Sequence, residues 1–477
     1  MSMNKKKYGT FVYILKSLYS IVFFVGVILY FLVSLTSYSE EIPRIYGLYL
    51  TLFGICTFLY FFKKDNLFCF ETIFFLIYFL GAFFPELVLQ NITENVNAYY
   101  SYTMNQLSEN KSLMLHTIGL YGYLWISAHV LIKSNYLKND YKTHVFSDYN
   151  ILKSSINYDM GVRIICFICS IFIIYLFLTG IIASWFHYSN SSAGYSNLSI
   201  VYLTIFFLLL TALEFTRLAR DQINSFKQFL KKTHKIYLVL IISISILLIV
   251  SGNRNECLLI LLPPVIAYST FIHRINNNIF VIGTFIGVIF MIIVGTTRQT
   301  DITAGVTDSV GLFESTRDFG VVNLNTSYLI EYTDQHGPIY FQNGFMFLVS
   351  SIPLLGSLFE LFGFSFATRT PELTTFGLQD AHNMDSGFGT ALIGDIYYSG
   401  LGLGVLLYMV LFGYLMSSLY VRFNYTKKFN IWLLLTYLFM FANAVYCVRA
   451  EWTMPFRYLG FSFFLLLVVY SFIKLKK

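Results

Sequence analysis

Long apolar runs dominate this chain and leave it few folds to adopt. Stretches of about twenty mainly apolar residues, the length that an α-helix needs to cross a bilayer, recur along nearly the whole sequence. Only 12% of the 477 residues are charged and 56% are hydrophobic, which leaves too few charges to cover a water-soluble protein of this size. The pattern predicts an integral membrane protein made of helices, because a helix satisfies its own backbone hydrogen bonds inside lipid.

The spacing of these runs predicts an all-α polytopic fold with about twelve transmembrane helices. We expect three parts, namely helices 1–9 over 1–295, a large loop over 296–390, and helices 10–12 over 391–477. The expected spans lie near 16–36, 45–62, 67–85, 113–132, 161–183, 197–215, 236–252, 257–273, 278–295, 400–420, 430–448 and 455–473.

Lysine placement orients these spans. If every span crosses, nearly all lysines outside the spans fall on one side, and Lys111 is the exception. Cytoplasmic loops carry an excess of basic residues, so that side is cytoplasmic and both termini lie on it. The loop over 296–390 is then external. Its apolar stretch Phe345–Gly363 is expected to be an interfacial or re-entrant helix, because a crossing there would move Lys427 and Lys428 outside.

Arginine is distributed differently from lysine. Seven of the twelve arginines fall on the predicted outer side, where lysine is nearly absent. A guanidinium stays charged and binds phosphate oxygens in pairs, so arginines near the outer headgroups suit an anionic, lipid-linked substrate. Arg44, which lies beside Glu40 and Glu41, is expected to be structural. The other six, predicted to bind phosphate, are Arg254, Arg298, Arg317, Arg369, Arg449 and Arg457.

Five titratable residues near the predicted outer face are candidates for catalysis. A carboxylate or a histidine held beside a reacting hydroxyl can remove its proton. Each candidate also has a simpler interpretation, as a polar loop residue or as the local partner of an arginine. They are His382 and Asp385 in the external loop, Glu256 and Glu451 in external turns, and Asp395 at a membrane edge.

The sequence contains no metal-ligand cluster and no glycine-rich nucleotide loop, so we expect neither a metal ion nor another cofactor. Cys166 and Cys169 form a C-x-x-C pair inside a predicted span, with no second pair, which favours packing over redox or metal chemistry. The net charge of +7 does not indicate nucleic-acid binding, because the lysines lie in short loops between apolar spans.

The chain resembles the O-antigen polymerases of the Wzy type, which assemble bacterial surface polysaccharides. The resemblance rests on the turn Ser251–Glu256 between adjacent spans, the large late external loop, and the glycine-rich helix start Gly394–Gly404. It implies a fold like that of the GT-C glycosyltransferases and a site on the outer face of the bacterial inner membrane. A growing glycan would leave undecaprenyl pyrophosphate and join an incoming lipid-linked repeat unit, in an inverting and metal-independent transfer. A polysaccharide chain-length regulator is a candidate partner.

Two alternatives stay open from the sequence. Secondary transporters and lipid-linked oligosaccharide flippases also have about twelve spans, but they place charged residues midway along them. O-antigen ligases carry a His-Asn pair shortly before a glycine-bearing helix. His382 and Asn383 are present here, but the glycines at 400, 402 and 404 lie further along than in that pattern. Charges at the outer ends of spans favour an extracytoplasmic enzyme.

Overall fold

The computed structural model places most of the predicted spans as helices. Within the described ranges, every regular element is an α-helix or a short 3-10 helix. The described residues are 68–83, 106–137, 157–185, 193–221, 223, 225–251, 254–273, 275–297, 317–340, 390–425, 430–452 and 454–474, with scattered positions in 14–32 and 352–362.

Three of these helices are long and apolar enough to cross a membrane. They lie over Tyr158–Leu178 in α7, Ser199–Arg220 in α9 and Leu392–Phe423 in α18, and the bent pair α10 and α11 forms a fourth candidate. The prediction of a helical membrane protein is thereby confirmed. The count of about twelve spans and the division of the chain at 295 and 390 stay predictions.

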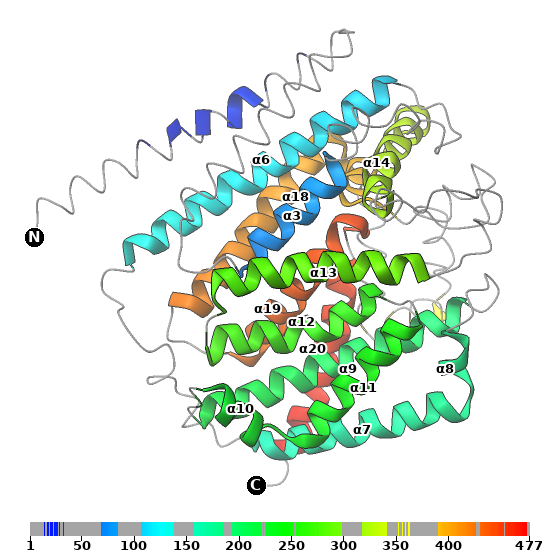
Figure 1. The fold of residues 1–477 in the computed structure, drawn as a ribbon. Coiled ribbons are helices and arrows are strands. Elements are labelled where there is room, and N and C mark those ends of the chain that lie inside the picture. Colours follow the sequence, from blue (N-terminus) through cyan, green and yellow to red (C-terminus); the bar gives the residue numbers. More distant parts are fainter. Residues whose placement is uncertain are drawn as a thin grey trace, which may run out of the picture.

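One group of helices contains α6 and α18, which pack side by side over much of their length (Figure 1). Small residues allow the close approach: a Cβ built on Gly413 would lie 2.7 Å from Cγ2 of Ile126 and 2.9 Å from the carbonyl oxygen of Tyr123. α3 and α14 pack against this pair. The bounds are α3 Phe70–Ala82, α6 Gln106–Leu137, α14 Arg317–His336 and α18 Leu392–Tyr425.

A second group of helices surrounds α9 (Figure 1). α7, α12 and α20 pack against α9, and α19 contacts α9, α12, α18 and α20, so α19 joins the two groups. The bounds are α7 Tyr158–Leu178, α8 Ile181–Ser184, α9 Ala193–Arg220, α10 Phe226–Lys232, α11 Lys235–Val250, α12 Arg254–Phe271, α13 Asn277–Thr297, α19 Ile431–Ala442 and α20 Met454–Lys474.

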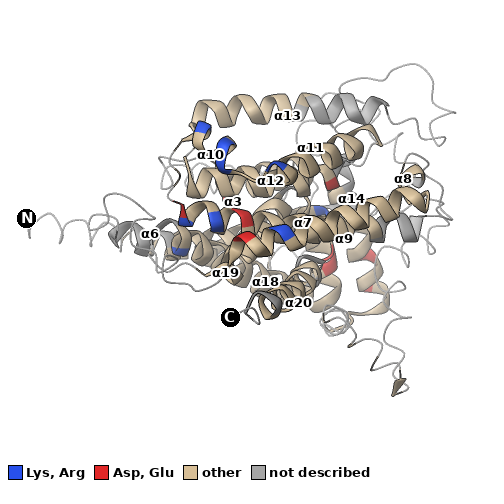
Figure 2. Ribbon diagram, turned by 90° about the horizontal axis from the view of Figure 1, so that it is seen from below, with Lys and Arg blue, Asp and Glu red and all other residues tan. Residues whose placement is uncertain are grey.

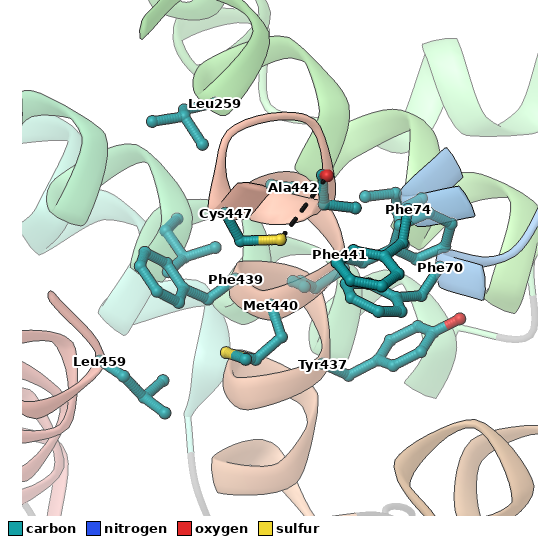
Figure 3. Packing of buried hydrophobic residues seen from close by; sticks show 14 of the residues in the cluster. Phe70, Phe74, Leu259, Tyr437, Phe439, Met440, Phe441, Ala442, Cys447 and Leu459 are labelled. Atoms are coloured by element: carbon teal, nitrogen blue, oxygen red, sulfur yellow. Dashed lines mark hydrogen bonds between the residues drawn. The ribbon is translucent and has the colours of Figure 1, made fainter. Parts of the chain in front are cut away.

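The segment after α19 does not continue as a helix. A span was expected over 430–448, but α19 ends at Ala442 and is followed by two 3-10 turns, η6 over Asn443–Val445 and η7 over Cys447–Arg449. Figure 3 shows this turn above α19, whose Phe441 lies beside rings of α3. Hydropathy does not distinguish a buried helix from a buried turn, because protein on all sides can satisfy irregular backbone at membrane depth.

Candidate functional site

A helix that the sequence did not predict docks into the first group. Within 296–390, where the sequence predicted a large loop with one interfacial or re-entrant helix over Phe345–Gly363, the structure has a further helix, α14, which packs against α3, α6 and α18. Its buried face is largely small and polar. Ser112 of α6 hydrogen-bonds Asn323, and Nε2 of His116 lies 3.1 Å from Oγ1 of Thr326. Polar contacts of this kind, rather than apolar area alone, hold α14 in the bundle. Most of Phe345–Gly363 lies outside the described residues, and its interfacial position stays a prediction.

The backbones of α14 and α18 touch beside one of the predicted site residues. A Cβ built on Gly394 would lie 2.9 Å from Cα of Thr326 and 2.8 Å from Cδ1 of Leu329. Only a residue without a side chain fits this contact. Because Asp395 follows immediately in the chain, the contact fixes the position of its backbone.

Asp395 is a buried carboxylate with defined partners. Its Oδ2 accepts a hydrogen bond of 3.0 Å from the backbone N–H of Trp452, and its carbonyl oxygen accepts one of 2.8 Å from the hydroxyl of Ser399. The carboxylate of Glu451 is near enough to act on Asp395 through its charge. The fold therefore pairs two acids that the sequence had singled out independently.

Trp452, which follows the turn after α19, bridges a break in α18. Gly400 and Leu401 leave helical geometry, and Leu401 has φ +57° and ψ −163°, a strained conformation for a residue with a side chain. Above the break, the Trp452 indole N–H donates to Oγ of Ser399 at 3.0 Å. Below the break, the hydroxyl of Tyr408 donates to the Trp452 carbonyl oxygen at 3.1 Å. Trp452 thus ties both halves of α18 to the turn that carries Glu451.

Arg449 lies in the same turn, at the end of η7. The guanidinium is partly buried, and no described residue forms an ion pair with it. Burial lowers the pKa of Arg449 from its ordinary value, because removal from water disfavours the charged form. Ala450, which ends η7, is extended, and Glu451 follows it directly. The turn thus carries a cation and an acid two residues apart in the chain.

The remaining predicted site residues are placed only in part. His382, Asp385, Arg298 and Arg369 lie outside the described residues. Glu256 lies in the first turn of α12. Three arginines lie in described helices, but their side chains lie outside the described part of the structure: Arg254 opens α12, Arg317 opens α14 and Arg457 lies near the start of α20.

An ion pair next to this region was not predicted as part of a site. Nζ of Lys111 lies 2.7 Å from Oδ2 of Asp334, and the hydroxyl of Tyr397 donates to Oδ1 of Asp334 at 2.9 Å. These three residues join α6, α14 and α18. The sequence signal was available, because Lys111 was the exception to the one-sided lysine distribution and needed a local partner.

Within the described residues, no group of three or more His, Cys, Asp or Glu side chains could hold a metal ion.

The fold and the site define a polytopic helical membrane protein whose bundle contains a carboxylate pair with an arginine in the adjoining turn. The chain matches the model of the O-antigen polysaccharide polymerase Wzy family over residues 17–477, nearly its whole length, and it belongs to that family. No curated protein and no solved structure matches it. Membership confirms the resemblance and makes the protein a membrane polymerase of polysaccharide repeat units.

Proposed function

We propose that this chain polymerises undecaprenyl-pyrophosphate-linked repeat units into O-antigen or a related surface polysaccharide at the periplasmic face of the inner membrane. Family membership supports the polymerisation itself. The proposal for the site rests on one observation: Glu451 and Asp395, which are far apart in the sequence, come close together, and Arg449 lies two residues before Glu451 in the same turn.

Arg449 is proposed to bind the pyrophosphate. A partly buried guanidinium without a carboxylate among the described residues suits an anion supplied by the substrate. As the bond between the anomeric carbon and the pyrophosphate oxygen breaks, the electron pair stays on that oxygen, and a fixed cation stabilises the developing charge. Arginines can supply this charge in place of a metal ion. We propose that Arg254, Arg298, Arg317, Arg369 and Arg457 converge on the same group.

Glu451 is proposed as the general base. The acceptor hydroxyl oxygen attacks the anomeric carbon from the side opposite the pyrophosphate, which inverts that centre, and its proton passes to the Glu451 carboxylate. Glu451 suits this role better than Asp395, because Glu451 is partly exposed whereas Asp395 is buried and held by Trp452. His382, Asp385 and Glu256 are the alternative bases.

Polymerisation of purified lipid-linked repeat units by the full chain tests this proposal. Glu451→Gln should lower kcat by about 100- to 10,000-fold, the range expected when a general base is lost. Arg449→Lys should also lower activity, since an ammonium lacks the paired donors of a guanidinium. Glu331→Gln, a partly exposed acid on α14, is the control and should leave activity unchanged. Addition of EDTA should not lower the rate. Full-length polymer from Glu451→Gln would refute the assignment of the base.

A further inference from the structure

A right-angle corner lies between α10 and α11, away from the proposed site. The two helices are bent by 99° across a break of two residues, Thr233 and His234. The hydroxyl of Thr233 donates to the carbonyl oxygen of Phe229 at 2.7 Å and closes the end of α10. α11 is an apolar helix of 16 residues, so if α11 runs across the bilayer, α10 runs along its surface.

A buried carboxylate holds this corner in place. Oε1 of Glu214 accepts the backbone N–H of His234 at 2.9 Å, and Oε2 lies 2.8 Å from Nδ1 of the same histidine. Arg217 donates to Glu214 at 2.7 Å and to the carbonyl oxygen of Lys232 at 2.6 Å. Nε2 of His234 lies 2.9 Å from Oδ1 of Asp159. The direction of α10 is therefore set by a bonded network that joins α7, α9 and α11.

The apolar side chains of α10 point in two directions. Phe229 is buried, with its ring 5.6 Å from that of Phe215 and 5.3 Å from that of Tyr268. Phe226 and Leu230, one turn apart, are 58% and 47% exposed. Phe229 anchors α10 to the bundle. The other two side chains form an apolar strip that stays about half exposed, although the Phe226 ring also lies 5.8 Å from that of Tyr268.

The basic side chains of α10 accompany this strip. Lys227, Lys231 and Lys232 are all exposed, and the helix contains no acidic residue (Figure 2). The acid Asp221 lies 3.9 Å from Nζ of Lys232, but it also lies 3.8 Å from Arg217. The helix therefore keeps an excess of positive charge next to exposed apolar side chains.

We propose that α10 is an interfacial helix that binds the headgroups of anionic phospholipids. Phe226 and Leu230 enter the boundary of the acyl chains, and the long stems of the lysines carry their ammonium groups outward to the lipid phosphates. Zwitterionic headgroups offer no net charge to these lysines, so the surface discriminates between lipids by charge. The inference uses no residue of the proposed catalytic site and stands independently of it.

Lipid binding to the full chain, purified in detergent, tests this proposal. Phosphatidylglycerol or phosphatidylcholine is titrated in, and bound lipids are counted by native mass spectrometry. The unmodified chain should bind phosphatidylglycerol more tightly, and added salt should weaken the preference. The triple variant K227Q/K231Q/K232Q should lose about 100-fold in affinity for phosphatidylglycerol, or about fivefold for each lysine. Its affinity for phosphatidylcholine should not change.

Two controls separate this interpretation from others. K227R/K231R/K232R keeps the charge and should keep the preference. Arg422→Gln removes one exposed charge elsewhere, in the last turn of α18, and it should have less effect than Lys227→Gln. If the triple variant fails to fold, the single variants Lys227→Gln and Lys231→Gln decide. An unchanged phosphatidylglycerol preference in a folded Lys→Gln variant would overturn the proposal.

Discussion

The contact between α14 and α18 at Gly394 gives the sharpest test of how the site is positioned. Replacing Gly394 by alanine adds one methyl group at a place where its nearest backbone neighbour, Cα of Thr326, would lie at 2.9 Å. Ordinary van der Waals contact begins at 3.4 Å, so the two helices must separate by at least about 0.5 Å. Because Asp395 is the next residue, the carboxylate pair should move with the helix.

The expected effect on stability is small because two contributions oppose each other. Overpacking a close contact costs about 1–3 kcal/mol. Alanine in a helix is about 1 kcal/mol more favourable than glycine. The net destabilisation is then about 0–2 kcal/mol. The rate is more sensitive: a displacement of 1 Å in an active site costs about 100-fold, so half that displacement should lower kcat about tenfold.

The assay measures kcat, KM and the apparent Tm of the purified Gly394→Ala chain. Gly413→Ala is the matched control, because its Cβ would meet a carbonyl oxygen of α6 at 2.9 Å in a comparable clash. It lies in the same helix but beyond the break at Gly400 and Leu401, away from Asp395. Gly283→Ala controls for the methyl group itself, since nothing lies within 4 Å of its Cβ.

Gly394→Ala should lower kcat while Gly413→Ala lowers only the apparent Tm. Gly283→Ala should leave activity unchanged and stability equal or slightly higher. A Gly394→Ala chain that keeps the full kcat would refute the reasoning, because α14 would then not fix the position of Asp395. An equal loss of kcat in the Gly394 and Gly413 variants would mean that general loosening of the bundle, and not local displacement, controls the rate.

Two other predictions concern the residues around the site. Tyr408→Phe removes the hydrogen bond to the Trp452 carbonyl oxygen, which is worth about 1 kcal/mol. In a steady-state assay this variant should lower kcat severalfold with little change in KM. Tyr414→Phe, on the exposed face of α18, is the control and should match the unmodified enzyme. Asp334→Lys places a like charge beside Lys111 and should lower the apparent Tm. Adding Lys111→Asp reverses the pair and should restore most of the lost Tm. An apparent Tm that does not recover in the double variant would count against the ion pair.

Part of the fold follows from sequence alone. In lipid, each segment must satisfy its own backbone hydrogen bonds, so a long apolar run predicts a helix without knowledge of its neighbours. The helices over Tyr158–Leu178 and Ala193–Arg220 match expected spans for this reason. Asp395 was a site candidate because a carboxylate at a membrane edge is costly unless it is paired or used.

The tertiary structure decided the features that depend on contacts between distant residues. α14 has a buried face made largely of small and polar residues, so no hydropathy pattern predicted this helix. Its position depends on partners in α6 that lie over 200 residues earlier in the chain, such as Ser112, which hydrogen-bonds Asn323. In the same way, Asp395 and Glu451 were separate candidates until the turn after α19 folded back and placed Trp452 against α18. Local composition specifies helices in a membrane because their hydrogen bonds are local. Which polar groups meet depends on packing between helices, and that information is distributed over the whole chain.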